Sequence, residues 1–174
     1  MIKKGEKSKT NQFVEFECYD NEGNFVGYFV SEEWLDEYAK AIDDFNMSIT
    51  LNPDQPVVYT MMGDSYSSLR DYERAIQNYS MAIQLDPNNE WTYTSRGMAY
   101  FFMNRDDYAI NDLNYVLRLN PNNYAAYVNL GLVYKGQGLN DLAIENFQKA
   151  LALATDPQSI QYIKQNLTEL GVSP

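Results

Sequence analysis

The sequence EWTYTSRGMAYFFMNRDDYAINDLNYVLRLNP, residues 90–121, decides the fold because its pattern returns at a constant interval on both sides. It closes with Leu-Asn-Pro at Pro121, and the same motif, or Leu-Asp-Pro, closes at Pro53 and Pro87, so the three prolines lie 34 residues apart. A fixed period of this length is the signature of a repeat array. The period defines three full units, 56–89, 90–123 and 124–157, with a partial unit, 31–55, before them.

Five positions of the unit hold similar residues in every copy. The fourth and eleventh are tyrosine, the eighth is glycine, the twentieth is alanine and the twenty-fourth is a large residue. In the order of the units these are Tyr59, Tyr93, Tyr127; Tyr66, Tyr100, Tyr134; Gly63, Gly97, Gly131; Ala75, Ala109, Ala143; and Tyr79, Leu113, Phe147. The set resembles the tetratricopeptide repeat (TPR) family over residues 33–157. The resemblance implies an all-α fold, an α-solenoid of helix-turn-helix repeats.

The same positions predict two facing amphipathic helices in each unit. The fourth, eighth and eleventh fall on one helical face, and the twentieth and twenty-fourth fall on the facing one. Glycine opposite alanine allows the two backbones to approach closely. The proline at the end of each unit then prevents the second helix from continuing.

The two ends of the array depart from this pattern. At the C-terminus, Asp156 as N-cap and Pro157 as first residue predict a capping helix over 157–171. At the N-terminus, residues 31–55 supply only the second helix of a unit, and residues 1–10 form a basic tail that we expect to be flexible. The apolar stripe of the capping helix is Ile160, Ile163, Leu167 and Leu170.

Residues 11–30 replace the missing first helix. They are rich in aromatic and β-branched residues on both sides of Asp20-Asn21-Glu22-Gly23, which predicts a β-hairpin. A lone hairpin is marginal in water, so it needs a surface to pack on. Two roles stay open: the hairpin covers the open end of the array, or its edge pairs with another chain and gives a homo-oligomer.

One unit carries a charged pair at positions that are otherwise uncharged. The seventh position is Met62 and Leu130 in the outer units but Arg96 in the middle one, and Asp112 occupies the twenty-third position on the facing helix. We predict a buried or half-buried bridge between Arg96 and Asp112. Its expected role is structural, because it fixes the first helix of the unit on the second.

The partner-binding surface is expected on the first helices, which line the inner wall of such an array. Their second, fifth, sixth, ninth, twelfth and thirteenth positions face away from the helix pair. The aromatic, methionine and aliphatic side chains found there favour a peptide or protein partner with apolar anchors. The candidate partner-binding residues are Val57, Thr60, Met61, Asp64, Trp91, Thr94, Met98, Phe101, Val128, Asn129 and Leu132.

Some members of the TPR family hold the C-terminal carboxylate of chaperones with lysine, arginine and asparagine side chains at the second, fifth, sixth and ninth positions. The required cations do not occur at the matching positions of this sequence, so we exclude that ligand. The residues present there include Thr60, Asp64, Ser95, Ala125 and Asn129.

Composition removes other classes of function. A net charge of -11 disfavours nucleic acid and anionic membranes, although the acidic stretch 15–54 would suit a basic partner. The chain has no histidine and a single cysteine, Cys18, so the commonest general base and metal ligand is absent and no internal disulfide can form. We therefore expect no enzyme activity, no cofactor and no metal. No export signal or membrane-spanning stretch is visible, which favours a cytoplasmic protein.

Two functions remain. The first is a non-catalytic interaction module that binds a peptide or protein partner in the concave groove. The alternative is a structural or self-assembling subunit of a larger complex, held through the N-terminal hairpin and the acidic region beside it.

Overall fold

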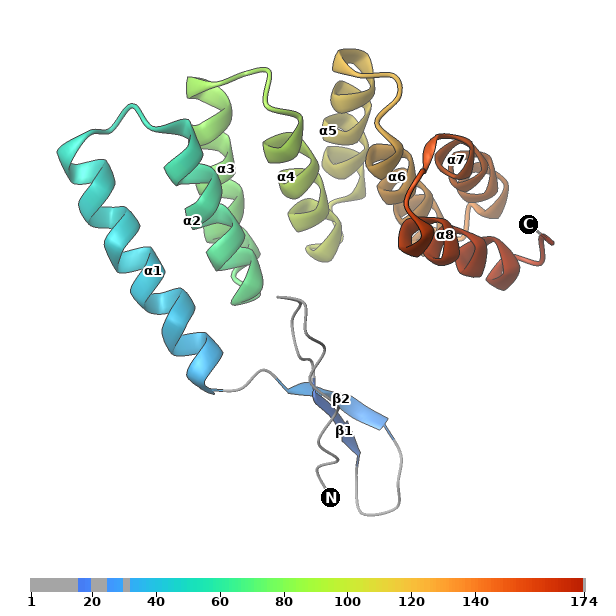
Figure 1. Ribbon diagram of the computed structural model, residues 1–174, viewed down its shortest axis with the longest axis horizontal. Helices are drawn as coiled ribbons and strands as arrows, with labels where there is room; N and C mark the ends of the chain where they lie inside the picture. The colour runs from blue at the N-terminus through green and yellow to red at the C-terminus, as the bar shows by residue number, and fades with distance from the viewer. Residues whose placement is uncertain (1–15, 20–24, 30–31, 174) are drawn as a thin grey trace.

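The repeated units form successive antiparallel helix pairs that follow one another in a curved row (Figure 1). The structure is a computed structural model, which describes residues 16–19, 25–29 and 32–173, with side chains from residue 36 onward. The described residues form eight helices, and the predicted helical solenoid is confirmed. They are α1 (Glu32–Leu51), α2 (Pro56–Ser68), α3 (Tyr72–Leu85), α4 (Glu90–Phe102), α5 (Asp106–Leu119), α6 (Tyr124–Gly136), α7 (Asn140–Leu153) and α8 (Pro157–Glu169).

The turn inside each unit has the same geometry in all three copies. The fifteenth residue of the unit takes a left-handed conformation, with φ of 59° at Arg70, 56° at Asn104 and 74° at Gly138. The next residue donates its backbone N–H to the carbonyl of the tyrosine five positions earlier, at 2.9 Å in each unit. This bond closes the first helix and reverses the chain. Glycine is the residue usually found there, yet only the third unit has one.

Short polar side chains begin several of the helices. The side-chain oxygens of Asp71, Asn89, Asn123 and Asp156 each accept a backbone N–H from the residue three positions later. Each bond satisfies one of the unpaired N–H groups at a helix start. Because all four residues lie at a unit boundary or at the turn within a unit, local sequence sets where the chain bends.

The core consists of the contacts between the two helices of each unit. Ala75, Ala109 and Ala143 have no exposed surface. The residues one turn later, Tyr79, Leu113 and Phe147, lie against the glycines of the facing helices and are at most 1% exposed. The close approach predicted from the small residues is therefore present in all three units.

The C-terminal helix α8 covers the last apolar surface of the array. Ile163 and Leu167 are buried among the apolar residues of α7, including Phe147. Asp156 accepts the Ser159 N–H at 2.8 Å, and Pro157 occupies the first turn, which are the two features expected of this helix start.

At the N-terminal end, α1 packs on α2 through Ile42 and the half-buried Phe45 and Ile49. Before it, strands β1 (Phe16–Tyr19) and β2 (Phe25–Phe29) pair antiparallel, with Phe16 opposite Phe29. The turn between the strands, the basic tail and the side chains of the hairpin lie outside the described residues. The prediction that the hairpin covers α1 stays a prediction.

Candidate partner-binding surface

The first helices of the units form one continuous wall. Helix α2 contacts α4 directly, and α4 contacts α6, while the second helices α3 and α5 pack against the next unit through its first helix. A hydrogen bond of 2.9 Å between the Thr60 and Thr92 hydroxyls joins α2 to α4. Helices that approach across unit boundaries lie on the inside of the curve, so α2, α4 and α6 line the inner wall of the array.

A cluster of large apolar side chains remains exposed on this wall. Val57 is 62% exposed, Met61 is 46% exposed and Trp91 is 64% exposed. Val57 and Met61 lie one turn apart on α2, and the Trp91 indole reaches from α4 to α2, where its Nε1 lies 3.4 Å from a carboxylate oxygen of Asp64. We call these three residues the α2–α4 patch. Exposed aromatic and methionine side chains are typical of surfaces that bind other proteins.

Both carboxylate oxygens of Asp64 contact other side chains of this protein. One of its oxygens accepts the Tyr79 hydroxyl at 2.7 Å and the other faces the Trp91 indole. Burial raises the pKa of Tyr79, and the neighbouring Asp64 carboxylate raises that pKa further, so the tyrosine stays neutral and keeps donating. Asp64 therefore orients Trp91 on the inner wall.

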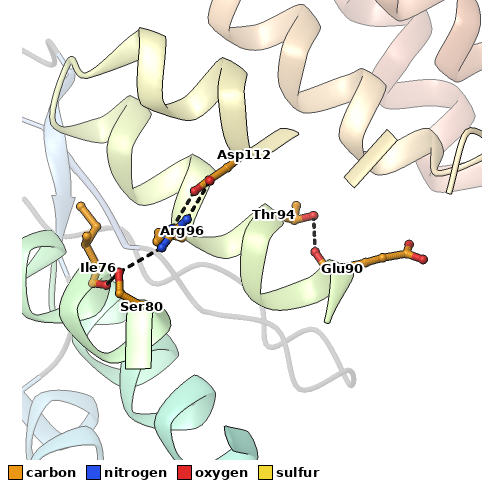
Figure 2. Close-up of polar contacts among 6 residues, drawn as sticks. All are labelled: Ile76, Ser80, Glu90, Thr94, Arg96 and Asp112. Atoms are coloured by element: carbon orange, nitrogen blue, oxygen red, sulfur yellow. Dashed lines mark hydrogen bonds and ion pairs between the residues drawn. The ribbon is translucent and has the colours of Figure 1, made fainter. Parts of the chain in front are cut away.

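Two predicted binding residues are less available than the sequence implied. Thr60 is only 7% exposed and bonds to Thr92, because α4 approaches α2 at this point. The expectation that Thr60 lies open on the surface is wrong. Thr94 is half-buried, and its hydroxyl donates to the Glu90 carbonyl within α4 at 2.8 Å (Figure 2).

The remaining candidates lie half-buried along α4 and α6. Phe101 contacts Gly136 of the next unit, where an added Cβ would come within 3.1 Å of its ring. It therefore helps to join two units as well as lining the wall. The other half-buried members are Met98, Val128, Asn129 and Leu132.

The charged pair of the middle unit lies behind this surface. Arg96 donates to Asp112 through Nε at 2.7 Å and through a terminal nitrogen at 2.8 Å, and to the Ser80 hydroxyl at 3.1 Å (Figure 2). The side chains are 17% and 4% exposed, so the predicted half-buried bridge is present. Burial alone would lower the pKa of Arg96, but the hydrogen bond and charge of Asp112 raise it, which keeps the guanidinium charged.

Sequence reasoning missed a pocket at the junction of α6 and α8. It has a volume of about 350 Å³. Val128 and Asn129, both predicted, form part of its wall, but the other five lining residues were not among the candidate partner-binding residues. The lining residues are Tyr124, Ala125, Val128, Asn129, Gln158, Ser159 and Tyr162. The order of the elements could have revealed this pocket. Helix α8 follows the third unit directly, in the place of the first helix of a fourth unit, so it extends the inner wall.

The described part of the chain contains neither a metal-binding cluster nor a membrane-spanning helix. Within it, no group of three or more histidine, cysteine, aspartate or glutamate side chains could hold a metal ion. None of its helices combines the length and apolar character needed to cross a membrane.

Comparison with known proteins agrees with this geometry. A family model described as TPR repeat matches residues 63–104, and another described as tetratricopeptide repeat matches residues 124–157. No curated protein matches the sequence.

Solved structures share the fold. The crystal structure of MamA is similar with a TM-score of 0.67 and 25% identity, covering 79% of this chain and 81% of that one. The thermophilic TPR protein TTC0263 of Thermus thermophilus is similar with a TM-score of 0.67 and 22% identity, over 79% and 76%. The first TPR of Spaghetti (RPAP3), bound to the HSP90 peptide SRMEEVD, has a TM-score of 0.58 and 23% identity, over 67% and 93%.

Fold and inner wall together define an α-solenoid of the kind that serves as a scaffold for protein–protein interaction. The matching repeats identify it further: this chain contains tetratricopeptide repeats.

Proposed function

We propose that this protein is a non-catalytic interaction module that binds a peptide segment of its partner along the inner wall, with apolar anchors on the α2–α4 patch. The observation that carries the proposal is the exposure of Val57, Met61 and Trp91, 46–64%, on adjacent helices of that wall. Burying such side chains at an interface removes apolar surface from water, and tryptophan is among the residues that contribute most to binding.

The groove does not suit an acidic chain end. The clamp of lysine, arginine and asparagine that holds such ends in some TPR proteins is replaced here by Thr60, Asp64, Ser95, Ala125 and Asn129. Thr60 is buried, and Asp64 would repel a carboxylate. We therefore expect that a peptide such as SRMEEVD does not bind.

A selection from a random peptide library displayed on phage, carried out on the full chain, tests the proposal. Peptides selected on the wild-type protein are expected to bind the double variant Trp91→Ala with Met61→Ser about thirtyfold more weakly. The reason is that a central tryptophan contributes about 2 kcal/mol to the binding free energy. Fluorescence anisotropy of the labelled peptides measures the loss.

The matched control is Tyr108→Ala. Tyr108 is an aromatic residue of similar exposure, 60%, but it belongs to α5 and not to the inner wall. Circular dichroism should show equal helicity for all variants. Enriched peptides that bind the double variant as tightly as the wild type would move the site away from the α2–α4 patch.

The second candidate function is self-assembly through the N-terminal strands. In the described residues β1 and β2 pair only with each other, so each strand has one edge without a partner strand. Such edges can extend a sheet across two chains. The acidic region beside them would contribute to the same contact.

Deletion of residues 1–30 separates the two roles of the hairpin. If the hairpin covers α1, the deletion exposes apolar surface and the truncated chain is expected to aggregate or unfold. If it mediates assembly, the truncated chain stays folded and becomes monomeric. Light scattering coupled to size exclusion, run over a range of concentrations on both chains, gives the mass that decides between them.

A further inference from the structure

The pocket between α6 and α8 has a wall of mixed character. Ala125 and Val128 give it an apolar side, the rings of Tyr124 and Tyr162 give it aromatic surface, and Asn129, Gln158 and Ser159 add neutral polar groups. No residue that lines it carries a charge. Its volume of about 350 Å³ lies at the lower end of the range of ligand pockets, which suits one long side chain rather than a large molecule.

A carboxylate lies at the edge of this pocket. The Tyr124 hydroxyl donates to Asp156 at 3.3 Å and also bonds to the Ser159 hydroxyl at 3.2 Å. The hydrogen bonds from Ser159, first of all from its backbone N–H, lower the pKa of Asp156, so this group is ionised at neutral pH. Asp156 therefore places a formal negative charge at the edge of the pocket, which attracts a cation and repels an anion.

Tyrosine rings in this protein repeatedly hold cations. The guanidinium of Arg74 lies 4.6 Å from the centre of the Tyr66 ring, and that of Arg118 lies 5.1 Å from the centre of the Tyr115 ring. In the described part of the chain no such cation lies over Tyr124 or Tyr162, although Tyr162 is 47% exposed. The Tyr162 ring is thus open to a cation from outside, whereas the half-buried Tyr124 ring packs against the core between α7 and α8.

From this chemistry we infer that the pocket binds a basic side chain of the partner, arginine in preference to lysine. The inference rests on the proposed function, since the same peptide would extend from the α2–α4 patch along α6. The aliphatic stem would pack on Val128 and Ala125, and the charged head would meet the Tyr162 ring and the Asp156 carboxylate. A planar guanidinium stacks on aromatic faces better than an ammonium group does.

A double-mutant cycle on peptides from the same phage library tests this inference. We expect the enriched peptides to share an arginine or lysine at a fixed spacing from an apolar residue. Changing that residue to glutamine in the peptide should weaken binding to the wild type about tenfold. The same change should have a smaller effect on binding to Tyr162→Ala, because one partner of the cation is then gone while Asp156 remains.

Two conservative variants make the test specific. Tyr162→Phe keeps the ring and should bind like the wild type, whereas Asp156→Asn keeps an N-cap but removes the charge and should weaken only the basic peptides. The inference is overturned if the enriched peptides need Trp91 but contain no basic residue. It is also overturned if the losses of binding free energy from the glutamine change in the peptide and from Tyr162→Ala in the protein are additive. Peptides that bind without needing Trp91 or Met61 contradict the proposed function instead.

Discussion

Replacing Asp112 with alanine is expected to lower the free energy of unfolding by about 3 kcal/mol, because it leaves a largely buried guanidinium without its carboxylate. The Arg96 side chain is 17% exposed, so water can reach it in part. The expected loss of stability therefore lies at the lower end of the range for broken buried ion pairs. Its bond to Ser80 remains, but a hydroxyl does not neutralise the charge. Urea denaturation followed by circular dichroism measures the change.

The protein supplies the control for this experiment in its own third unit. There the equivalent positions are Leu130 and Asn146, and the Asn146 amide donates to the Leu142 carbonyl within its helix at 2.8 Å. The double variant Arg96→Leu with Asp112→Asn copies that pair and should recover most of the lost stability, because neither charge is then buried. An unchanged midpoint for Asp112→Ala would show that the bridge does not hold α4 on α5.

Alanine at Gly131 is expected to lower the free energy of unfolding by about 2 kcal/mol, although alanine is the better helix former. A Cβ added there would lie 2.7–2.9 Å from three ring atoms of Phe147, closer than nonbonded carbons approach. Phe147 is fully buried, so its ring cannot move aside without disturbing the packing of α7. Thermal and urea denaturation of the two proteins measure the difference.

Gly97 is the matched control for the close approach. It occupies the same position in the middle unit, but its partner is Leu113, and an added Cβ would lie 3.3 Å from the nearest atom. The gain in helix propensity and the mild crowding should nearly cancel, leaving Gly97→Ala within about 0.5 kcal/mol of the wild type. Equal losses at Gly131 and Gly97 would mean that the large aromatic partner is not the cause.

The sequence predicted the helical repeat because the signals for it are local or periodic. Tyrosine, glycine and alanine at fixed positions mark the faces of the two helices, and proline ends each unit. The Arg96–Asp112 bridge could be predicted as well, since both residues lie within one unit, where the geometry follows from the repeat pattern.

Contacts between units were less predictable. Thr60 belongs to the positions that face away from its own helix pair, yet it is buried because α4 of the next unit lies against it. Phe101 likewise contacts Gly136 of the following unit. The repeat period predicts that units follow one another along the chain. It does not predict how closely the first helices of successive units approach.

The sequence alone determined the repeat, the start of the C-terminal capping helix and the pairing of the two helices in each unit. The reason is that capping, amphipathic spacing and small residues act within about 34 residues of chain. Only the tertiary structure decided which inner-wall residues stay exposed, how Asp64 orients Trp91, and that α8 forms an open pocket with α6. These features depend on the packing between units, which brings together residues about one repeat apart in the sequence.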